Sequence, residues 1–200
     1  MFNPFQPLQM IKTEVFMSMP AKFRKKSRTA WSDPNRQNAE VECFLEGPSF
    51  DREGNLWFVD IPFGRIFRIT PKKDWELVTQ YDGWPNGLKI HKDGRIFICD
   101  YKEGLLTLDP KTGKFEFFST GIPEYYAYDV WADKHGEVWT ATEYADRVVR
   151  INTKTREAIS YLLPGPTNMR RAHGDNRTKP AHFWVGGTHT ASVVRLEPLD

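Results

Sequence analysis

The chain has 200 residues, enough for one domain with a well-buried core or for two small ones. Its 28 basic and 26 acidic residues nearly cancel, which argues against a nucleic acid partner, and it lacks the run of roughly 18 apolar residues that a membrane helix needs. Aromatic residues make up 14% of the chain, a content more typical of β proteins than of helical ones.

The N-terminal part, residues 1–40, is expected to form an arm outside the main domain. Its first ten residues lack the basic and then apolar pattern of a signal peptide, so we expect a cytoplasmic protein. Residues 12–19, KTEVFMSM, are a candidate strand. The stretch 22–40 is polar, basic and without period, and is expected to be a surface loop.

Residues 41–200 contain four copies of a repeat of about 40 residues. Each copy has a turn followed by an apolar and aromatic strand: DREGNLWFVD, HKDGRIFICD, DKHGEVWTAT and, with a longer turn, NRTKPAHFWVGG. A second strand word follows each of these: GRIFRIT, EGLLTLD, DRVVRIN and ASVVRLE. Apolar and polar residues alternate within the words, which predicts half-buried strands.

The repeats predict an all-β fold, a β-propeller with four four-stranded blades at about 46–81, 86–120, 128–163 and 168–200. An ordinary antiparallel sandwich is the alternative, but four copies of two separate words argue against it. The last unit ends after three strands, so residues 12–19 are expected to supply the fourth and close the ring. A homo-oligomer would complete the ring if four blades do not close alone.

One polar residue per blade is expected at one mouth of the central tunnel. Counting eight residues back from each turn glycine gives Glu46, Asn86 and Tyr128, and Asn168 is the nearest equivalent in the last unit. A carboxylate and two amide oxygens around one axis predict a divalent cation site at Glu46, Asn86 and Asn168, with Ca²⁺ favoured and Mg²⁺ or Zn²⁺ as alternatives. Strand capping or bonding to tunnel water is the alternative role, and is preferred for Asn168 taken alone.

The words FLEGPSFDREGNLWFVDIPFGRIFRI (44–69) and PNGLKIHKDGRIFICDYKEGLLTLDP (85–110) resemble the gluconolactonase, senescence-marker-protein and LRE-like family, over about residues 10–117. The resemblance implies a six-bladed propeller that hydrolyses lactones or related esters at one divalent cation. It implies a ligand role for Glu46 in the EGP word. Asn86 lies in a similar Asn-Gly word, but in a blade that does not usually donate a ligand. Asp129 follows its ring position as the Asp of the family's Asn-Asp word does.

Residues of about 121–200 resemble blades of the streptogramin (virginiamycin B) lyase type, through AYDVWADKHGEVWTATEYADRVVRINTKTREAISYLLP (127–164) and FWVGGTHTASVVRLEPLD (183–200). This resemblance implies seven blades and ring opening by elimination, with Mg²⁺, a His and a Glu. Tyr128 occupies the slot of that His, and Thr142 that of the Glu. Glu143 is expected on the opposite face of its strand, because side chains alternate along a strand. Neither catalytic set is complete.

A histidine, an aspartate and two cysteines complete the set of catalytic and reactive candidates. His189, just after the strand FWVGG, is the most plausible histidine for a general base, and Asp129 is the other catalytic candidate. Cys43 and Cys99 are expected as buried free thiols, in preference to a single bridge between them. The sequence favours a metal-dependent hydrolase of small lactones or esters. A streptogramin-type C–O lyase and a non-catalytic binding propeller are the alternatives.

Overall fold

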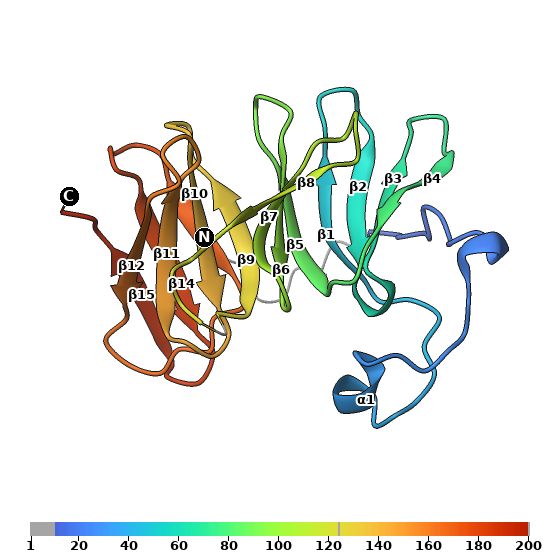
Figure 1. Cartoon of the computed structure of the whole chain (residues 1–200), viewed down its shortest axis with the longest axis horizontal. Coiled ribbons are helices and arrows are strands. Elements are labelled where there is room, and N and C mark those ends of the chain that lie inside the picture. Colours follow the sequence, from blue (N-terminus) through green and yellow to red (C-terminus); the bar gives the residue numbers. More distant parts are fainter. Residues whose placement is uncertain (1–10, 124, 200) are drawn as a thin grey trace, which may run out of the picture.

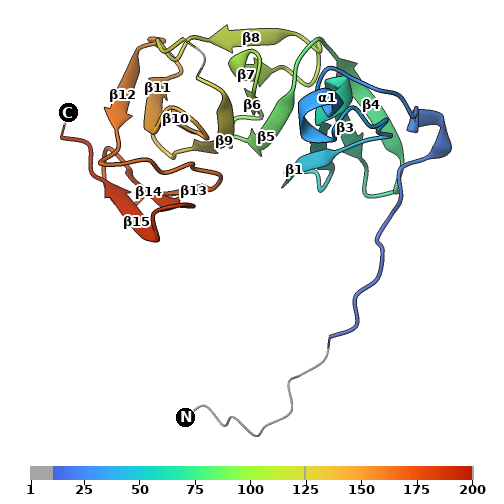
Figure 2. The ribbon, with the colours of Figure 1, turned by 90° about the horizontal axis from the view of Figure 1, so that it is seen from below.

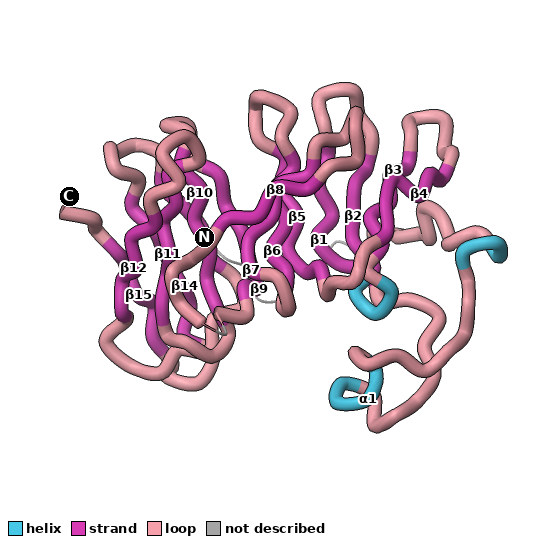
Figure 3. Tube along the Cα trace, in the orientation of Figure 1, coloured by secondary structure: helices cyan, strands magenta, loops and turns pink. Residues whose placement is uncertain are grey.

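The computed structural model describes residues 11–123 and 125–199, so residues 1–10 of the expected arm lie outside the described part (Figure 1). Strands dominate the described chain. The helical pieces are short: η1 (Ala21–Phe23), α1 (Ser32–Asn35) and η2 (Ile61–Phe63), all in the N-terminal third (Figure 3). No helix among the described residues is long and apolar enough to cross a membrane.

Four antiparallel sheets follow one another along the chain, each with its strands in sequence order. Blade 1 contains β1 (Leu45–Phe50), β2 (Leu56–Asp60), β3 (Arg65–Ile69) and β4 (Trp75–Gln80). Blade 2 contains β5 (Pro85–Ile90), β6 (Ile96–Asp100), β7 (Gly104–Leu108) and β8 (Phe115–Phe118). Blade 3 contains β9 (Ala127–Ala132), β10 (Glu137–Thr142), β11 (Arg147–Asn152) and β12 (Ala158–Leu162). Blade 4 contains β13 (Ala172–Asp175), β14 (His182–Gly187) and β15 (Ser192–Leu196).

The blades stand side by side along an open arc, with the first strand of each blade on the inner side (Figure 2). This arrangement and the all-β content confirm the predicted propeller architecture. Because β1, β5, β9 and β13 share the inner side, their side chains and starting residues gather near one axis.

Apolar side chains on alternate strand positions hold neighbouring blades together. Trp57 of β2 lies in a buried cluster between blades 1 and 2, Phe97 of β6 in one between blades 2 and 3, and Trp139 of β10 in one between blades 3 and 4. These residues occupy the same place in the repeat word. Each fully buried side chain of this size contributes about 1.5–3 kcal/mol to folding.

Glycines sit where the inner strands approach one another most closely. A Cβ on Gly47 would lie 2.6 Å from the main-chain oxygen of Asn86, and one on Gly87 would lie 2.8 Å from that of Tyr128. The ring of Trp131 lies directly against Gly174. Each blade-to-blade contact on the inner side therefore has one residue without a side chain.

The N-terminal segment does not close the ring. Residues 12–19 form no strand, and the fourth sheet has three strands within the described chain, so the predicted closure of blade 4 is wrong. Met19 instead lies buried on the outer face of blade 1 with Phe58, Phe67 and Trp75. That face is apolar and has no preceding blade among the described residues, and burying it favours the observed position of the arm.

Candidate functional site

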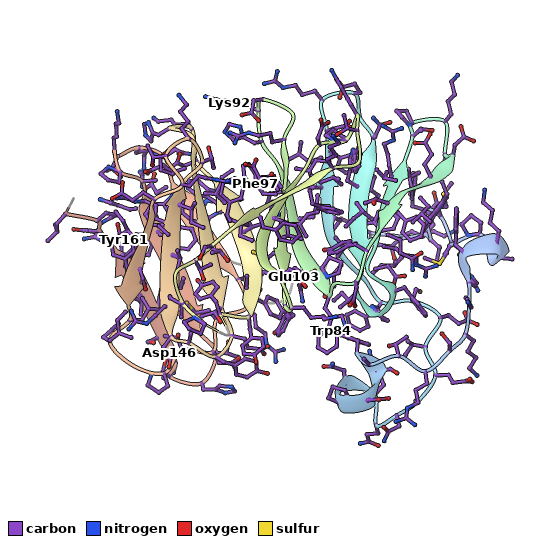
Figure 4. The ribbon with its side chains drawn as sticks, in the orientation of Figure 1. Trp84, Lys92, Phe97, Glu103, Asp146 and Tyr161 are labelled. Carbon is purple, nitrogen blue, oxygen red and sulfur yellow. The ribbon has the colours of Figure 1, made fainter. Side chains whose placement is uncertain are left out.

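The candidate site lies at the edge of the arc where the inner strands begin. This is the lower edge in Figure 4, where Trp84 and Asp146 lie, whereas Lys92 marks the opposite edge. Leu45, the first residue of β1, pairs with Asp60, the last of β2, and the other complete blades repeat this arrangement. The residues that start the inner strands therefore share one mouth.

Glu46 is held at this mouth by a bulge in β1. It pairs with Val59, and the pairing shifts by one residue before Ser49. Gly47 takes a positive φ of 61°, a conformation that favours glycine, and allows the bulge. The Glu46 side chain is 24% exposed, and its Oε2 lies 3.7 Å from a guanidinium nitrogen of Arg171.

Asn86 lies beside Glu46, as the repeat register predicted. It sits in a bulge of β5 between Pro85 and Leu88, and the main-chain contact with Gly47 joins the two strands. The side chain is buried, at 5% exposure. Its Oδ1 accepts no hydrogen bond from any residue that the structure describes.

Asp129, rather than Tyr128, occupies the third ring position. Asp129 pairs with Ala141 as Glu46 pairs with Val59, and both partners stand two residues after the repeat tryptophan. A register shift between Ala141 and Thr142 moves the position by one residue, which counting along the sequence could not detect. The Asp129 carboxylate accepts hydrogen bonds from the main-chain N–H groups of Val130 (3.0 Å) and Ala172 (3.2 Å). It therefore ties blade 3 to blade 4.

The two remaining sequence candidates lie off the ring. Asn168 precedes β13 by four residues and accepts a hydrogen bond at its main-chain oxygen from the Thr188 hydroxyl (2.6 Å). Its position at the start of the inner strand was therefore a wrong prediction, because blade 4 has a longer turn. Its Oδ1 is buried and unpartnered within the described chain. His189 is exposed in the β14–β15 turn. Among the described residues, it forms no hydrogen bond with a residue of the ring.

Arg170 and Arg171 were not among the sequence candidates. They precede β13, and their side chains diverge, Arg171 toward Glu46 of blade 1 and Arg170 toward Glu143 of blade 3. The only sequence signal for these residues was a pair of adjacent arginines before an inner strand. Because the surrounding stretch is polar and no other motif lies at a fixed distance from the pair, this signal did not mark them as site residues. The structure shows their importance through their partners.

Glu143 forms the centre of a second cluster at this mouth. It is 8% exposed, accepts a hydrogen bond from Nε of Arg170 at 3.1 Å and another from the Tyr101 hydroxyl. Burial and the Glu143 carboxylate raise the pKa of Tyr101. Strand alternation along the sequence predicts that Glu143 faces away from Thr142, but Glu143 follows the end of β10, where this alternation no longer applies, and its side chain is buried.

Tyrosine rings line the space beside Glu143. Tyr101 lies edge-on to Tyr128 at 5.8 Å between ring centroids, and Tyr126 lies 6.1 Å from Tyr101 and 6.0 Å from Tyr144. Aromatic rings with polar edges suit the binding of small cyclic molecules. A cleft of about 1060 Å³ opens at the opposite edge between the turns of blades 1 and 2, and no ring residue lines it.

Cys43 and Cys99 are both free thiols, as expected. Cys99 is fully buried, whereas Cys43 is half-buried on the arm side of blade 1. Burial raises the pKa of the Cys99 thiol and of the Cys43 thiol. Neither belongs to the inner-strand mouth.

Two lactonases have sequences similar to this chain. Lactonase drp35 of Staphylococcus saprophyticus is 39% identical over 189 residues, which are 85% of this chain and 55% of that protein. Lactonase drp35 of Staphylococcus epidermidis is 29% identical over 133 residues, 62% of this chain and 41% of the relative. The chain thus spans about half the length of these relatives or less.

Solved propellers of two kinds share the fold. A gluconolactonase from Xanthomonas campestris superposes with a TM-score of 0.63 at 12% identity, over 79% of this chain and 59% of the other. Virginiamycin B lyase from Staphylococcus aureus superposes with a TM-score of 0.60 at 16% identity, over 78% of this chain and 56% of the other. At such identities the likeness concerns the fold alone. The family profile of the SMP-30/gluconolactonase/LRE-like region matches residues 44–148, over half of the chain, and the protein belongs to that family.

Proposed function

We propose that this chain hydrolyses small lactones or related esters at the inner-strand mouth. The observation that carries the proposal is the partly exposed Glu46 carboxylate, the EGP glutamate, beside the Arg171 guanidinium at 3.7 Å. Membership of the family and the similarity to drp35 lactonases support it. Because the chain spans about half of those relatives, their activity enters here as a proposal.

A divalent cation fits the oxygen atoms of this mouth. Glu46 and Asp129 offer carboxylates, and the buried Oδ1 of Asn86 is unused within the described chain. Asn168 lies off the ring, so its unpartnered Oδ1 is not counted among these ligands. Such oxygens suit Ca²⁺ or Mg²⁺ better than Zn²⁺, and the described residues contain no group of three or more His, Cys, Asp or Glu side chains placed to hold a metal ion. A bound cation would polarise the lactone carbonyl and acidify water.

The protein's own side chains contribute binding and positioning. Asp129 is fixed by two main-chain N–H groups and holds blades 3 and 4 in register at the mouth. Arg171 balances the charge of Glu46, and because its side chain is 67% exposed it is free to turn toward the carboxylate that ring opening produces. The tyrosine rings beside Glu143 offer an aromatic surface for the ring of the substrate.

The test compares the wild type with Glu46→Gln and with Glu53→Gln as matched control, on a panel of aliphatic lactones. Glu53 lies in the β1–β2 turn at the opposite edge of blade 1. We expect lactonase activity in the wild type and control and its loss in Glu46→Gln. Isothermal titration with Ca²⁺ and Mg²⁺ shows whether Glu46 acts as a cation ligand. If Glu46→Gln loses both cation binding and activity, Glu46 is a ligand; if it loses activity alone, Glu46 acts without binding the cation. Intact hydrolysis in Glu46→Gln would refute the proposal.

Elimination is a second candidate, favoured by one observation. Glu143 is buried at the mouth and oriented by Arg170 and Tyr101, near the slot where streptogramin-type lyases carry their Glu. Mass spectrometry of the product from a cyclic depsipeptide distinguishes the reactions. Hydrolysis adds the mass of one water, whereas elimination leaves the mass unchanged. A product of unchanged mass that disappears in Glu143→Gln would establish the lyase.

A further inference from the structure

Blade 4 differs from the other blades at its outer edge. The outer side of β15 has no pairing strand within the described chain, so a row of main-chain N–H and C=O groups is unpaired. The adjoining face is apolar and open: Trp184 is 37% exposed and Val193 is 73% exposed. The equivalent tryptophans of blades 1 and 3, Trp57 and Trp139, are buried by the next blade.

Residues 11–16 form an exposed, extended segment with the sequence of an outer strand. Ile11 and Val15 are each 80% exposed, and Phe16 is 60% exposed. The outer strands of blades 1 and 2 contain a glutamate followed by two apolar residues, in Glu76-Leu77-Val78 and Glu116-Phe117-Phe118. The segment repeats this pattern in Glu14-Val15-Phe16.

Blade 1 supplies the register for such a strand. Its outer-strand residue Glu76 pairs with Arg68 of β3 and forms an ion pair with it, and the Arg68 guanidinium lies over the Trp57 ring at 5.3 Å. In blade 4 the corresponding guanidinium, that of Arg195, lies over the Trp184 ring at 5.6 Å. Arg195 now pairs with Glu197 of its own strand region.

A strand added to β15 in the blade 1 register would place Glu14 opposite Arg195. Continued without the bulge that blade 1 has at Val78, as the outer strand of blade 2 pairs, the strand places Val15 opposite Val194 and Phe16 opposite Val193. Phe16 would then cover the most exposed apolar side chain of β15. A single register therefore satisfies the charge pairing, the outer-strand sequence pattern and the need to cover the exposed apolar side chain.

The segment does not lie along β15 of its own chain. Met17 and Met19 pack on blade 1, and blade 1 and β15 are at opposite ends of the arc (Figure 2). We propose that residues 11–16 of one copy add as the fourth strand to blade 4 of a second copy. Reciprocal exchange of the two segments gives a closed dimer.

The test is a charge swap measured by sedimentation velocity on the full chain at micromolar concentration. We expect a mass of two chains for the wild type and for Glu40→Arg, a control in the exposed part of the arm. Glu14→Arg and Arg195→Glu each oppose two like charges and should raise the dissociation constant by about tenfold or more. The double variant, Glu14→Arg with Arg195→Glu, should restore the dimer.

Circular dichroism of each variant checks that the blades remain folded. A wild-type monomer at every concentration would overturn the proposal, and protection of residues 11–16 from hydrogen exchange in that monomer would show closure within one chain instead. A dimer that survives both single changes, or that the double variant fails to restore, would equally overturn it. A mass above two chains would exclude reciprocal exchange.

Discussion

The two ends of the arc differ in how their apolar end faces are covered. At blade 1, a segment outside the repeat covers the outer face through Met19 and Phe23. At blade 4, the described chain leaves Trp184 and Val193 open to solvent. The difference teaches that the cover of an end blade does not have to be another blade, since a short irregular segment with a few large side chains buries the end face of blade 1.

The cover on blade 1 is fixed by a buried ion pair. Arg65 of β3 donates to Asp60 at 2.7 Å and to the main-chain oxygen of Phe23 in the arm at 2.7 Å. The other oxygen of Asp60 accepts a hydrogen bond from the N–H of Phe44 at 2.7 Å. Asp60 thus connects the arm, the segment before β1 and the sheet.

The largest expected effect is that of Asp60→Ala. It leaves the Arg65 guanidinium buried without its carboxylate, which costs about 3–5 kcal/mol of the free energy of unfolding. Urea denaturation measures this loss. Asp175→Ala, which removes the partner of the 87% exposed Arg177 in blade 4, should cost at most about 1 kcal/mol. Equal losses in the two variants would contradict the difference between the ends.

A smaller effect is expected for Phe23→Ala, which weakens the cover itself. The Phe23 ring lies edge-on to Phe67 at 5.1 Å and 6.5 Å from Trp75. Loss of these contacts should cost about 1–2 kcal/mol and speed proteolysis of the arm. Phe117→Ala, on an outer strand where the ring is 54% exposed, is the control and should change stability by less than about 0.5 kcal/mol. An unchanged rate of arm cleavage would refute the covering role.

The smallest effect concerns pH and the first turn of blade 1. Burial acts to raise the pKa of Asp51, but hydrogen bonds from Trp57 and Asn55 outweigh it and lower that pKa. The ionised carboxylate therefore stabilises the fold above its ordinary pKa of about 3.9, and this contribution disappears as pH falls through the lower folded value. Blade 4 has Thr178 at the corresponding place.

Comparison of Asp51→Asn with Thr178→Val by thermal melting between neutral pH and pH of about 3 tests this difference. The wild type should lose more stability on acidification than Asp51→Asn, by less than about 1 kcal/mol because the carboxylate is partly exposed. Thr178→Val should lose as much stability on acidification as the wild type does. If Asp51→Asn lost as much stability on acidification as the wild type, the Asp51 carboxylate would make no contribution to the pH dependence.

The repeats determine most of the fold from sequence, because strand alternation and turn glycines are local signals. Glu46 and Asn86 were placed beside one another for the same reason. The sequence predicted Tyr128 at the third ring position, whereas the structure places Asp129 there. The one-residue register shift that causes this difference depends on how β9 and β10 pair, which counting along the sequence does not show. Residues 12–19 have a strand pattern, but the apolar face of blade 1 retains Met19.

The charged partners at the mouth could not be predicted from pattern. Arg171 reaches Glu46 across the arc from the opposite end of the chain, and such a contact leaves no periodic trace in the sequence. Glu143 follows the last strand position of β10, where the alternation rule ends without a sequence marker. These residues become candidates only once the inner strands are placed side by side.

The close contacts at Gly47, Gly87 and Gly174 have a consequence for the number of blades. Gly47 and Gly87 let the main chains of neighbouring inner strands touch, and Gly174 makes room for the Trp131 ring, so the inner side of each described blade junction is narrow. A side chain at Gly47 would act as a wedge against Asn86 and reduce the angle through which successive blades turn. A ring built with a smaller angle per blade needs more blades to close. Three positions without side chains therefore set the curvature of this protein.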